Sequence, residues 1–349
     1  MLKKMILVTL LLVILSGVAL MVSQKKNETD PREGQSIMKT VDINELSRIL
    51  IQGNNTPVEL EKNENQQWLV KSEHYLASSE ELQKLLVKFM ETKIGHKVTD
   101  NPQHHEKFRV LHIDQNNGQW DAQKTGTLVR LLKQDGSPVL EVILGKDRVQ
   151  GGGQYFRYAG DDSVFLILQN LIVPTDSEEW LDKLIIDLDA KKLVKNISVT
   201  PSDNDPYVLI RDKEDAEWQT TLTGQESLKQ EDIGTLLDQL KDLQFLKLMP
   251  VSTPATETGR ERVTTLEFEN FDGRILLLVV GEDKVSSEDY HYMHVSMKLR
   301  EGVTDDALKQ EVDTFNARTQ NWLYGLSNYK GIAFLKHRSD LVKTSGASE

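Results

Sequence analysis

The sequence predicts an α+β protein in which an N-terminal transmembrane helix precedes two tandem duplicated units of antiparallel strands, each with a long covering helix. Three observations lead to this fold class: an apolar run at the N-terminus, a repeated strand and tryptophan pattern in the body, and an amphipathic helix pattern in each repeat. The 349 residues are enough for an anchor and two domains of ordinary size.

The N-terminal run covers residues 5–22, carries no charge and follows Lys3 and Lys4. It approaches the roughly 20 residues that cross a hydrocarbon core, and it exceeds the roughly 7–15 apolar residues of a cleaved signal peptide. We therefore expect an uncleaved signal anchor, and a cleaved signal peptide remains the alternative. Lys25 and Lys26 behind the run equal the positive charge of Lys3 and Lys4 in front of it. The free amino terminus adds positive charge to the front, which favours a short N-terminus on the cytoplasmic side. The expected location is the bacterial inner membrane, single-pass, with a periplasmic body.

Composition and periodicity divide the rest of the chain. A polar, aperiodic stretch indicates a tether, and a short charged end indicates a disordered tail. The expected parts are an anchor at 1–24, a linker at 25–40, a first α+β unit at 41–189, a second α+β unit at 190–341 and a tail at 342–349.

Each unit opens with a strand, a tryptophan and then a helix. Val58 corresponds to Val208 and Trp68 to Trp218 at the same offset. Apolar residues then recur at i, i+3, i+4 and i+7, the spacing of one buried helix face. These residues are Leu82, Leu85, Leu86 and Phe89 in the first unit, and Ile233, Leu236, Leu237 and Leu240 in the second. Ser78 and Glu81 have the spacing of a capping box at the start of the first helix.

The helix is followed in each unit by a hairpin. Gly136 and Gly273 each follow an aspartate between two apolar runs, a strong signal for a tight turn. The second strands end at Gly145 and Gly281. The first unit has extra residues within 101–125, and the second has an inserted helix around residues 305–315.

Charge and cysteine content restrict the classes of partner. The net charge of −12 argues against nucleic acid, which proteins bind through clustered lysine and arginine. The absence of cysteine excludes a thiol nucleophile and lipoprotein acylation. It also fits an envelope protein that does not depend on disulfides.

Histidines are the first candidates for chemistry. His104, His105 and His112 lack the convergent ligand spacing of a zinc site, so we predict a solvated loop. His291 and His294 stand three apart on a predicted strand, where side chains three apart face opposite sides. We therefore predict no metal ligand among them.

Three other patterns also lack the residues that their chemistry needs. Residues 151–153 are glycines, but a strand follows them instead of the helix of a phosphate loop. Two aspartate pairs lack the spaced ligands of a calcium loop, and both are interpreted as turns: Asp187 with Asp189, and Asp203 with Asp205. The sequence thus predicts no catalytic, cofactor-binding or metal-binding residue, and no enzyme.

One pattern resembles a known family. Its residues are Leu144-Gly145-Lys146, Tyr155 with Arg157, Trp180-Leu181-Asp182-Lys183 and Leu188-Asp189. Together with the anchor, the tryptophan strand and the amphipathic helix, they resemble the uncharacterised bacterial envelope proteins of domain of unknown function family 4340. The resemblance covers about residues 41–341 and implies an accessory protein near ABC transporters of the gliding-motility type. It supplies no catalytic residues.

The expected function is therefore a membrane-anchored extracytoplasmic interaction or accessory module, with a protein partner in an ABC-type envelope complex. One alternative is an envelope hydrolase acting on glycan or peptide, since paired carboxylates are invisible in a sequence this acidic. Another is a solute-binding protein with a deep pocket between the units.

Overall fold

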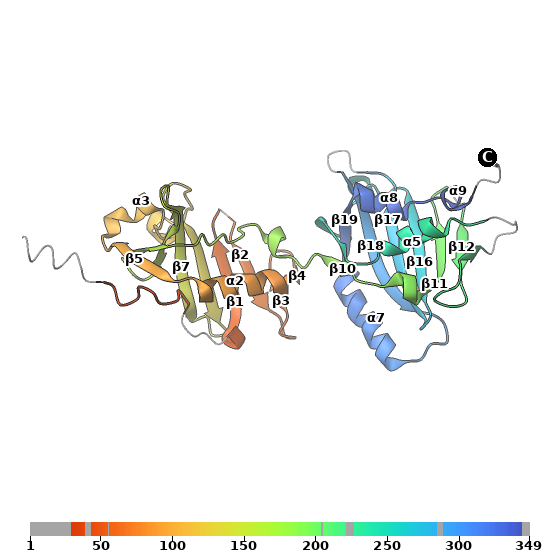
Figure 1. Ribbon diagram of the computed structural model, residues 1–349, viewed down its shortest axis with the longest axis horizontal. Coiled ribbons are helices and arrows are strands. Elements are labelled where there is room, and N and C mark those ends of the chain that lie inside the picture. The colour runs from red at the N-terminus through yellow and green to blue at the C-terminus, as the bar shows by residue number, and fades with distance from the viewer. Residues whose placement is uncertain are drawn as a thin grey trace, which may run out of the picture. The chain divides into compact units, whose positions relative to one another are not determined.

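The computed structural model describes residues 29–38, 43–54, 56–203, 205–220, 227–284 and 289–343. It divides into two compact units, of which unit 1 ends at Asp182 and unit 2 begins at Lys183 (Figure 1). The sequence places this boundary after Asp189. The two units are described separately below.

Unit 1 is built on a nine-stranded antiparallel sheet with the strand order β4-β3-β2-β1-β6-β7-β8-β9-β5. Its strands are β1 (Leu46–Gln52), β2 (Val58–Lys62), β3 (Trp68–Val70), β4 (Tyr75–Leu76), β5 (Ile94–Thr99), β6 (Thr127–Lys133), β7 (Pro138–Asp147), β8 (Gln154–Tyr158) and β9 (Val164–Ile167). Its helices are η1 (Ile43–Glu45), α2 (Ser79–Glu91), η2 (Pro102–His104), α3 (His105–Phe108), η3 (Ile113–Asn116) and η4 (Ser177–Trp180).

Unit 2 contains an eight-stranded antiparallel sheet with the order β13-β12-β11-β16-β17-β18-β19-β15, and a two-stranded sheet of β10 and β14. Its strands are β10 (Leu184–Ile186), β11 (Val194–Thr200), β12 (Tyr207–Ile210), β13 (Gln219–Thr220), β14 (Leu243–Gln244), β15 (Lys247–Pro250), β16 (Val263–Asn270), β17 (Arg274–Gly281), β18 (Tyr290–Leu299) and β19 (Trp322–Ser327). Its helices are α4 (Ala190–Leu193), α5 (Gln230–Asp238), α6 (Ala255–Thr258), α7 (Asp306–Thr319), α8 (Asn328–Phe334) and α9 (Arg338–Leu341).

The predicted fold class, a transmembrane helix followed by two duplicated units that each carry a long covering helix, is wrong. Large antiparallel sheets dominate both units, and the helices are few and short rather than long layers over the sheets. The helix predicted to cover each sheet has 13 residues in α2 and only 9 in α5. Alternate residues of β16 are buried, so one face of this strand packs in the core and the other is partly exposed.

The two helices nevertheless bury the residues that their spacing predicts. Leu82, Leu85, Leu86 and Phe89 are the buried residues of α2, and the Ser78 side chain accepts a hydrogen bond from the Glu81 N–H. In α5 the buried residues are Ile233, Leu236 and Leu237. Leu240 is also buried but lies beyond the end of that helix. Lys229 at the N-cap of α5 makes no side-chain cap hydrogen bond, which fits a short helix.

The membrane predictions are corrected as well. None of the helices within the described residues is long and apolar enough to span a membrane. The longest, α7, has 14 residues, whereas a span needs roughly 20. The described residues therefore do not support the predicted transmembrane signal anchor, the membrane as a partner or the single-pass inner-membrane location with a periplasmic body. The expected span at 5–22 lies outside the described residues, as do parts of the expected linker and tail.

Candidate functional site

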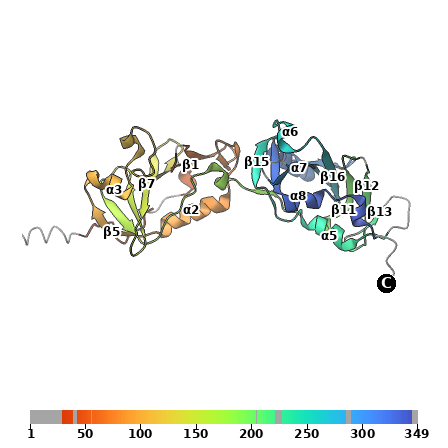
Figure 2. The same cartoon turned by 90° about the horizontal axis from the view of Figure 1, so that it is seen from above.

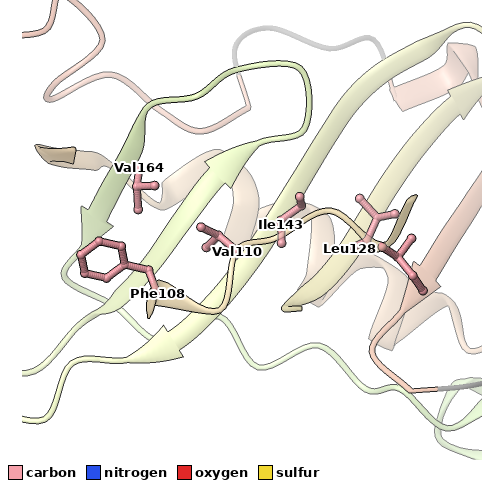
Figure 3. Packing of buried hydrophobic residues seen from close by; sticks show 6 residues of the cluster. Phe108, Val110, Leu128, Ile143 and Val164 are labelled. Carbon is pink, nitrogen blue, oxygen red and sulfur yellow. The ribbon is translucent and has the colours of Figure 1, made fainter. Parts of the chain in front are cut away.

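The extra segment at 101–125 forms a second small core on the sheet of unit 1. Phe108, Val110 and Ile113 from this segment pack with three buried sheet residues, which are Leu128, Ile143 and Val164 (Figure 3). Leu128 points to the opposite face from its buried neighbour Val129, because side chains alternate along a strand. The view from above shows α3 and α2 on opposite sides of the sheet (Figure 2).

Local sequence explains how this segment turns and how closely it approaches the sheet. Asn101 caps η2, and Pro102 begins it, a position that suits proline because its missing N–H has no helical partner. Arg109 ends α3 in a left-handed conformation. Underneath, a Cβ on Gly145 would lie 2.5 Å from the Phe108 carbonyl oxygen. Glycine therefore allows the backbone of the segment to lie directly on β7.

The three histidines of this segment occupy three separate environments. The His104 ring contacts the Thr99 hydroxyl at 3.3 Å and is exposed. His105 is fully buried, and its Nε2 lies 3.0 Å from the Asp162 carbonyl oxygen. His112 caps η3. The prediction of a solvated loop is therefore wrong for His105. Its burial is not visible in the sequence, because its neighbours are polar. Burial lowers the pKa of His105 below its ordinary 6.5, because the charged ring would lose its water.

His112 lines a polar hollow of about 350 Å³ beside the segment. The His112 Nδ1 accepts a hydrogen bond from the Asp114 N–H, so the neutral ring carries its proton on Nε2. That Nε2 lies 3.4 Å from the Glu141 carboxylate, and Arg130 Nε donates to the same oxygen at 2.7 Å. This network fixes the segment to β6 and β7.

Arg157, part of the family motif, forms the buried wall of the hollow. Its guanidinium donates to the Val110 carbonyl and to the Asp161 carbonyl, both at 2.9 Å. The remaining amino group, Nη2, is buried without a hydrogen-bond partner. Desolvation lowers the pKa of this arginine. Its role in the structure is to tie β8 to the segment and to the turn before β9.

The chemistry available in the hollow follows from these bonds. The carboxylate of Glu141 already accepts from Arg130 and His112, and Asp114, the other carboxylate of the hollow, is exposed. Within the described residues, no three histidine or acidic side chains come close enough to hold a metal ion. Arg130 and Glu141 are not among the residues predicted from the sequence, although each is a charged residue that interrupts an apolar strand.

The remaining candidates of the sequence lie apart from this hollow. In unit 1, residues 151–153 form the β7–β8 loop, and each glycine has a positive φ. In unit 2, His291 is buried between the Gly281 carbonyl and the Asn328 side chain, while His294 contacts the Gln320 carbonyl.

The two aspartate pairs lie in connections between elements, Asp187 and Asp189 between β10 and α4, and Asp203 and Asp205 between β11 and β12. Asp187 accepts from the Asp242 N–H, and Asp189 pairs with Lys192. Asp203 accepts from the N–H of Asp205.

A cluster of exposed aliphatic side chains lies at one end of unit 1. Val149 is 96% exposed, Leu168 79% and Ile172 77%. Strand register brings Val149 and Leu168 to the same end of the sheet, since Asp147 pairs with Gln154 and Gln154 pairs with Ile167. Ile172 lies at this end because the N–H of its neighbour Leu171 donates to the Gln154 side chain. We call Val149, Leu168 and Ile172 the apolar end of unit 1. The sequence shows these residues but not their exposure, which depends on loops that no periodicity describes.

The family assignment rests on one comparison. The family model described as Domain of unknown function (DUF4340) matches residues 68–261, more than half of the chain. The protein belongs to this family. The match spans α2, the hairpins of unit 1 and the buried Arg157, and it confirms the resemblance to this family. No curated protein and no solved structure matches the chain.

Proposed function

We propose that this member of the DUF4340 family is an interaction module that binds a partner protein through the apolar end of unit 1. The observation that carries this proposal is the exposure of Val149, Leu168 and Ile172 together. Single exposed aliphatic residues are ordinary, but several large ones gathered at one end of a sheet are typical of a protein-binding surface.

The loops that carry these residues are held by hydrogen bonds. Arg148 N–H donates to the Gly153 carbonyl, which closes the β7–β8 loop. The Gln154 side chain accepts from the Leu171 N–H, which fixes the segment after β9. A surface ordered in this way loses less conformational entropy on binding than a free loop would.

The setting implied by the family resemblance is an ABC-type transport or gliding-motility system. That association stays a prediction, as does the absence of catalysis. The proposal itself requires only that a protein partner covers the apolar end.

Photo-crosslinking of the full chain in its own cells tests the proposal. A photoreactive residue at Val149 or Leu168 should give one discrete adduct with a second protein. Gln134 is the matched control, since it is exposed in the hairpin at the opposite end of β7. The substitutions Val149→Asp and Ile172→Asp should abolish the Leu168 adduct without changing the circular dichroism spectrum.

Three outcomes would contradict the proposal. They are an identical adduct from Gln134, no adduct from either apolar position, and an adduct composed only of two copies of this chain.

A further inference from the structure

Arg148 lies at the apolar end of unit 1, directly beside Val149. Its backbone N–H donates to the Gly153 carbonyl in the β7–β8 loop. A Cβ placed on Gly151 would lie 3.6 Å from the Arg148 guanidinium carbon, so this side chain lies over the glycines of the loop. Arg148 therefore adds a positive charge next to an exposed aliphatic side chain.

Lys93 lies at the same end of the sheet. Ile94 pairs with Ile167 in the antiparallel register of β5 and β9. Lys93 comes before Ile94 and Leu168 comes after Ile167, so both leave the sheet at this end, and both are exposed. Strand β9 lies between β5 and β8 in the sheet, and β7 follows β8. Leu168 therefore stands between Lys93 and Arg148, which we call the basic rim of the apolar end.

The basic rim is not neutralised within unit 1. In the part of the chain that the structure describes, no carboxylate forms an ion pair with Lys93 or Arg148. Residues 168–175 carry no charge. Residues 88–93 and 146–153 together contain four basic side chains and two acidic ones, which are Glu91 and Asp147. This end of unit 1 thus has a positive surplus in a chain whose net charge is −12.

We propose that the partner protein presents aliphatic side chains flanked by acidic residues, so that its carboxylates pair with the basic rim while its aliphatic groups cover the apolar end. This inference rests on the proposed function and adds the chemistry of the partner to it. Burial of Val149, Leu168 and Ile172 supplies the attraction between the two surfaces. The basic rim selects the partner, because opposite charges guide association and like charges oppose it.

Charge reversal combined with photo-crosslinking tests this inference. The full chain carries the photoreactive residue at position 168 and is crosslinked in its own cells. The double variant Lys93→Glu with Arg148→Glu should lower the adduct yield about fivefold or more, because the rim then repels acidic groups. The double variant Lys93→Arg with Arg148→Lys keeps both charges and should keep most of the yield.

Lys107→Glu is the matched control for reversal of a charge. Lys107 is exposed on α3, where the neighbouring His105 contacts the β8–β9 turn at the opposite end of the sheet. The control should leave the adduct yield unchanged. Circular dichroism and thermal melting show whether each variant keeps its fold. If the Glu variant does not fold, Lys93→Gln with Arg148→Gln removes the charges without adding new ones and should lower the yield about twofold or more.

Two further measurements report on the chemistry of the partner. Mass spectrometry of the adduct should find Asp or Glu beside the residue of the partner that is attached to position 168. In a cell lysate, the adduct yield should fall as the salt concentration rises from roughly 0.05 M to 0.5 M, because salt screens the pairing of exposed charges.

The outcomes separate this inference from the proposed function. An equal adduct yield from the folded reversal variant and the unsubstituted chain would overturn the inference and leave the proposed function standing. No adduct from the unsubstituted chain at either Val149 or Leu168 would overturn both. Binding of the full chain to phosphatidylglycerol vesicles that is lost in the reversal variant would assign the basic rim to a lipid surface, which also contradicts the inference.

Discussion

The segment at 101–125 in unit 1 and helix α7 in unit 2 both lie on their sheets, but different forces hold them. The unit 1 segment inserts three buried apolar side chains, Phe108, Val110 and Ile113. Only Val312 and Thr319 of α7 are buried. Burial of one large apolar side chain contributes about 1.5–3 kcal/mol, whereas one net hydrogen bond contributes about 0.5–1.5 kcal/mol. Attachment of the unit 1 segment should therefore be the stronger.

Helix α7 is attached mainly through polar groups. Strand β19 pairs with β18 only over Tyr290–Met293. Further along, the Asn316 side chain receives the Met297 N–H and donates to the Met297 carbonyl, both at 2.8 Å. One amide side chain thus takes the place that a neighbouring strand would occupy. The comparison shows two ways in which a segment is held on an antiparallel sheet. One is burial of apolar side chains against the sheet, and the other is hydrogen bonding to backbone groups that have no neighbouring strand.

The largest effect is expected at the apolar anchor. Phe108→Ala should lower the free energy of unfolding by about 3–5 kcal/mol, because it removes a buried ring that also lies 4.6 Å from the ring of Tyr155. Urea unfolding of the full chain measures this loss. Gln103→Ala, an exposed position of η2, is the control and should change stability by less than about 0.5 kcal/mol. A loss at Phe108 no larger than at Gln103 would contradict the apolar attachment.

A smaller loss is expected at the polar anchor. Asn316→Ala should cost about 1–3 kcal/mol, because both backbone groups of Met297 lose their partner. Asn316→Asp keeps the acceptor and should cost less. Gln310→Ala on the exposed side of α7 is the control. If Asn316→Ala destabilises the chain more than Phe108→Ala, the ranking of the two attachments is reversed.

The next effect concerns the cap of η3. His112→Ala should cost about 1 kcal/mol, because the Asp114 N–H loses its acceptor and Glu141 loses one of its donors. Arg130 still pairs with Glu141 in this variant, which limits the loss. The same urea experiment measures it, and His104→Ala serves as the exposed histidine control. Equal small losses at both positions would show that the His112 network does not hold the segment.

The smallest effect appears only in mild acid. The folded chain binds the His105 proton at a lower pH than the unfolded chain, whose histidine titrates near 6.5. Below about pH 6.5 the unfolded state therefore binds more protons, and the free energy of unfolding falls as the pH falls. His105→Gln should have a flatter profile between about pH 7.5 and 5.5. Parallel profiles for the two proteins would exclude this contribution.

The sequence predicts the local parts of this structure better than the long-range ones. The period of 3.6 identifies the buried face of α2, and the Asp-Gly pairs identify hairpin turns at Gly136 and Gly273, where φ is positive. Both signals depend on neighbours in the chain. The burial of His105 depends on a carbonyl 57 residues away, and no local pattern carries that information.

The proportion of helix to sheet could not be predicted from the sequence, because it also depends on long-range contacts. Amphipathic periodicity predicts that one face of α5 is buried. It does not show that the nine residues of α5 cover only a small part of an eight-stranded sheet. The candidate site shows the same limit, since the sequence shows Arg130 and Glu141 on separate strands but not their pairing with His112. Strand order in the two large sheets is a further example, because hydrophobic pattern alone does not determine it.

The close approach of the segment at 101–125 to β7 requires glycine at position 145. A Cβ there would meet the Phe108 carbonyl at 2.5 Å and the Val110 side chain at 2.6 Å. A larger residue would therefore push the segment at 101–125 away from β7. In the series Gly145, Gly145→Ala and Gly145→Val, the face of the sheet under the segment should become more exposed to solvent as the side chain grows.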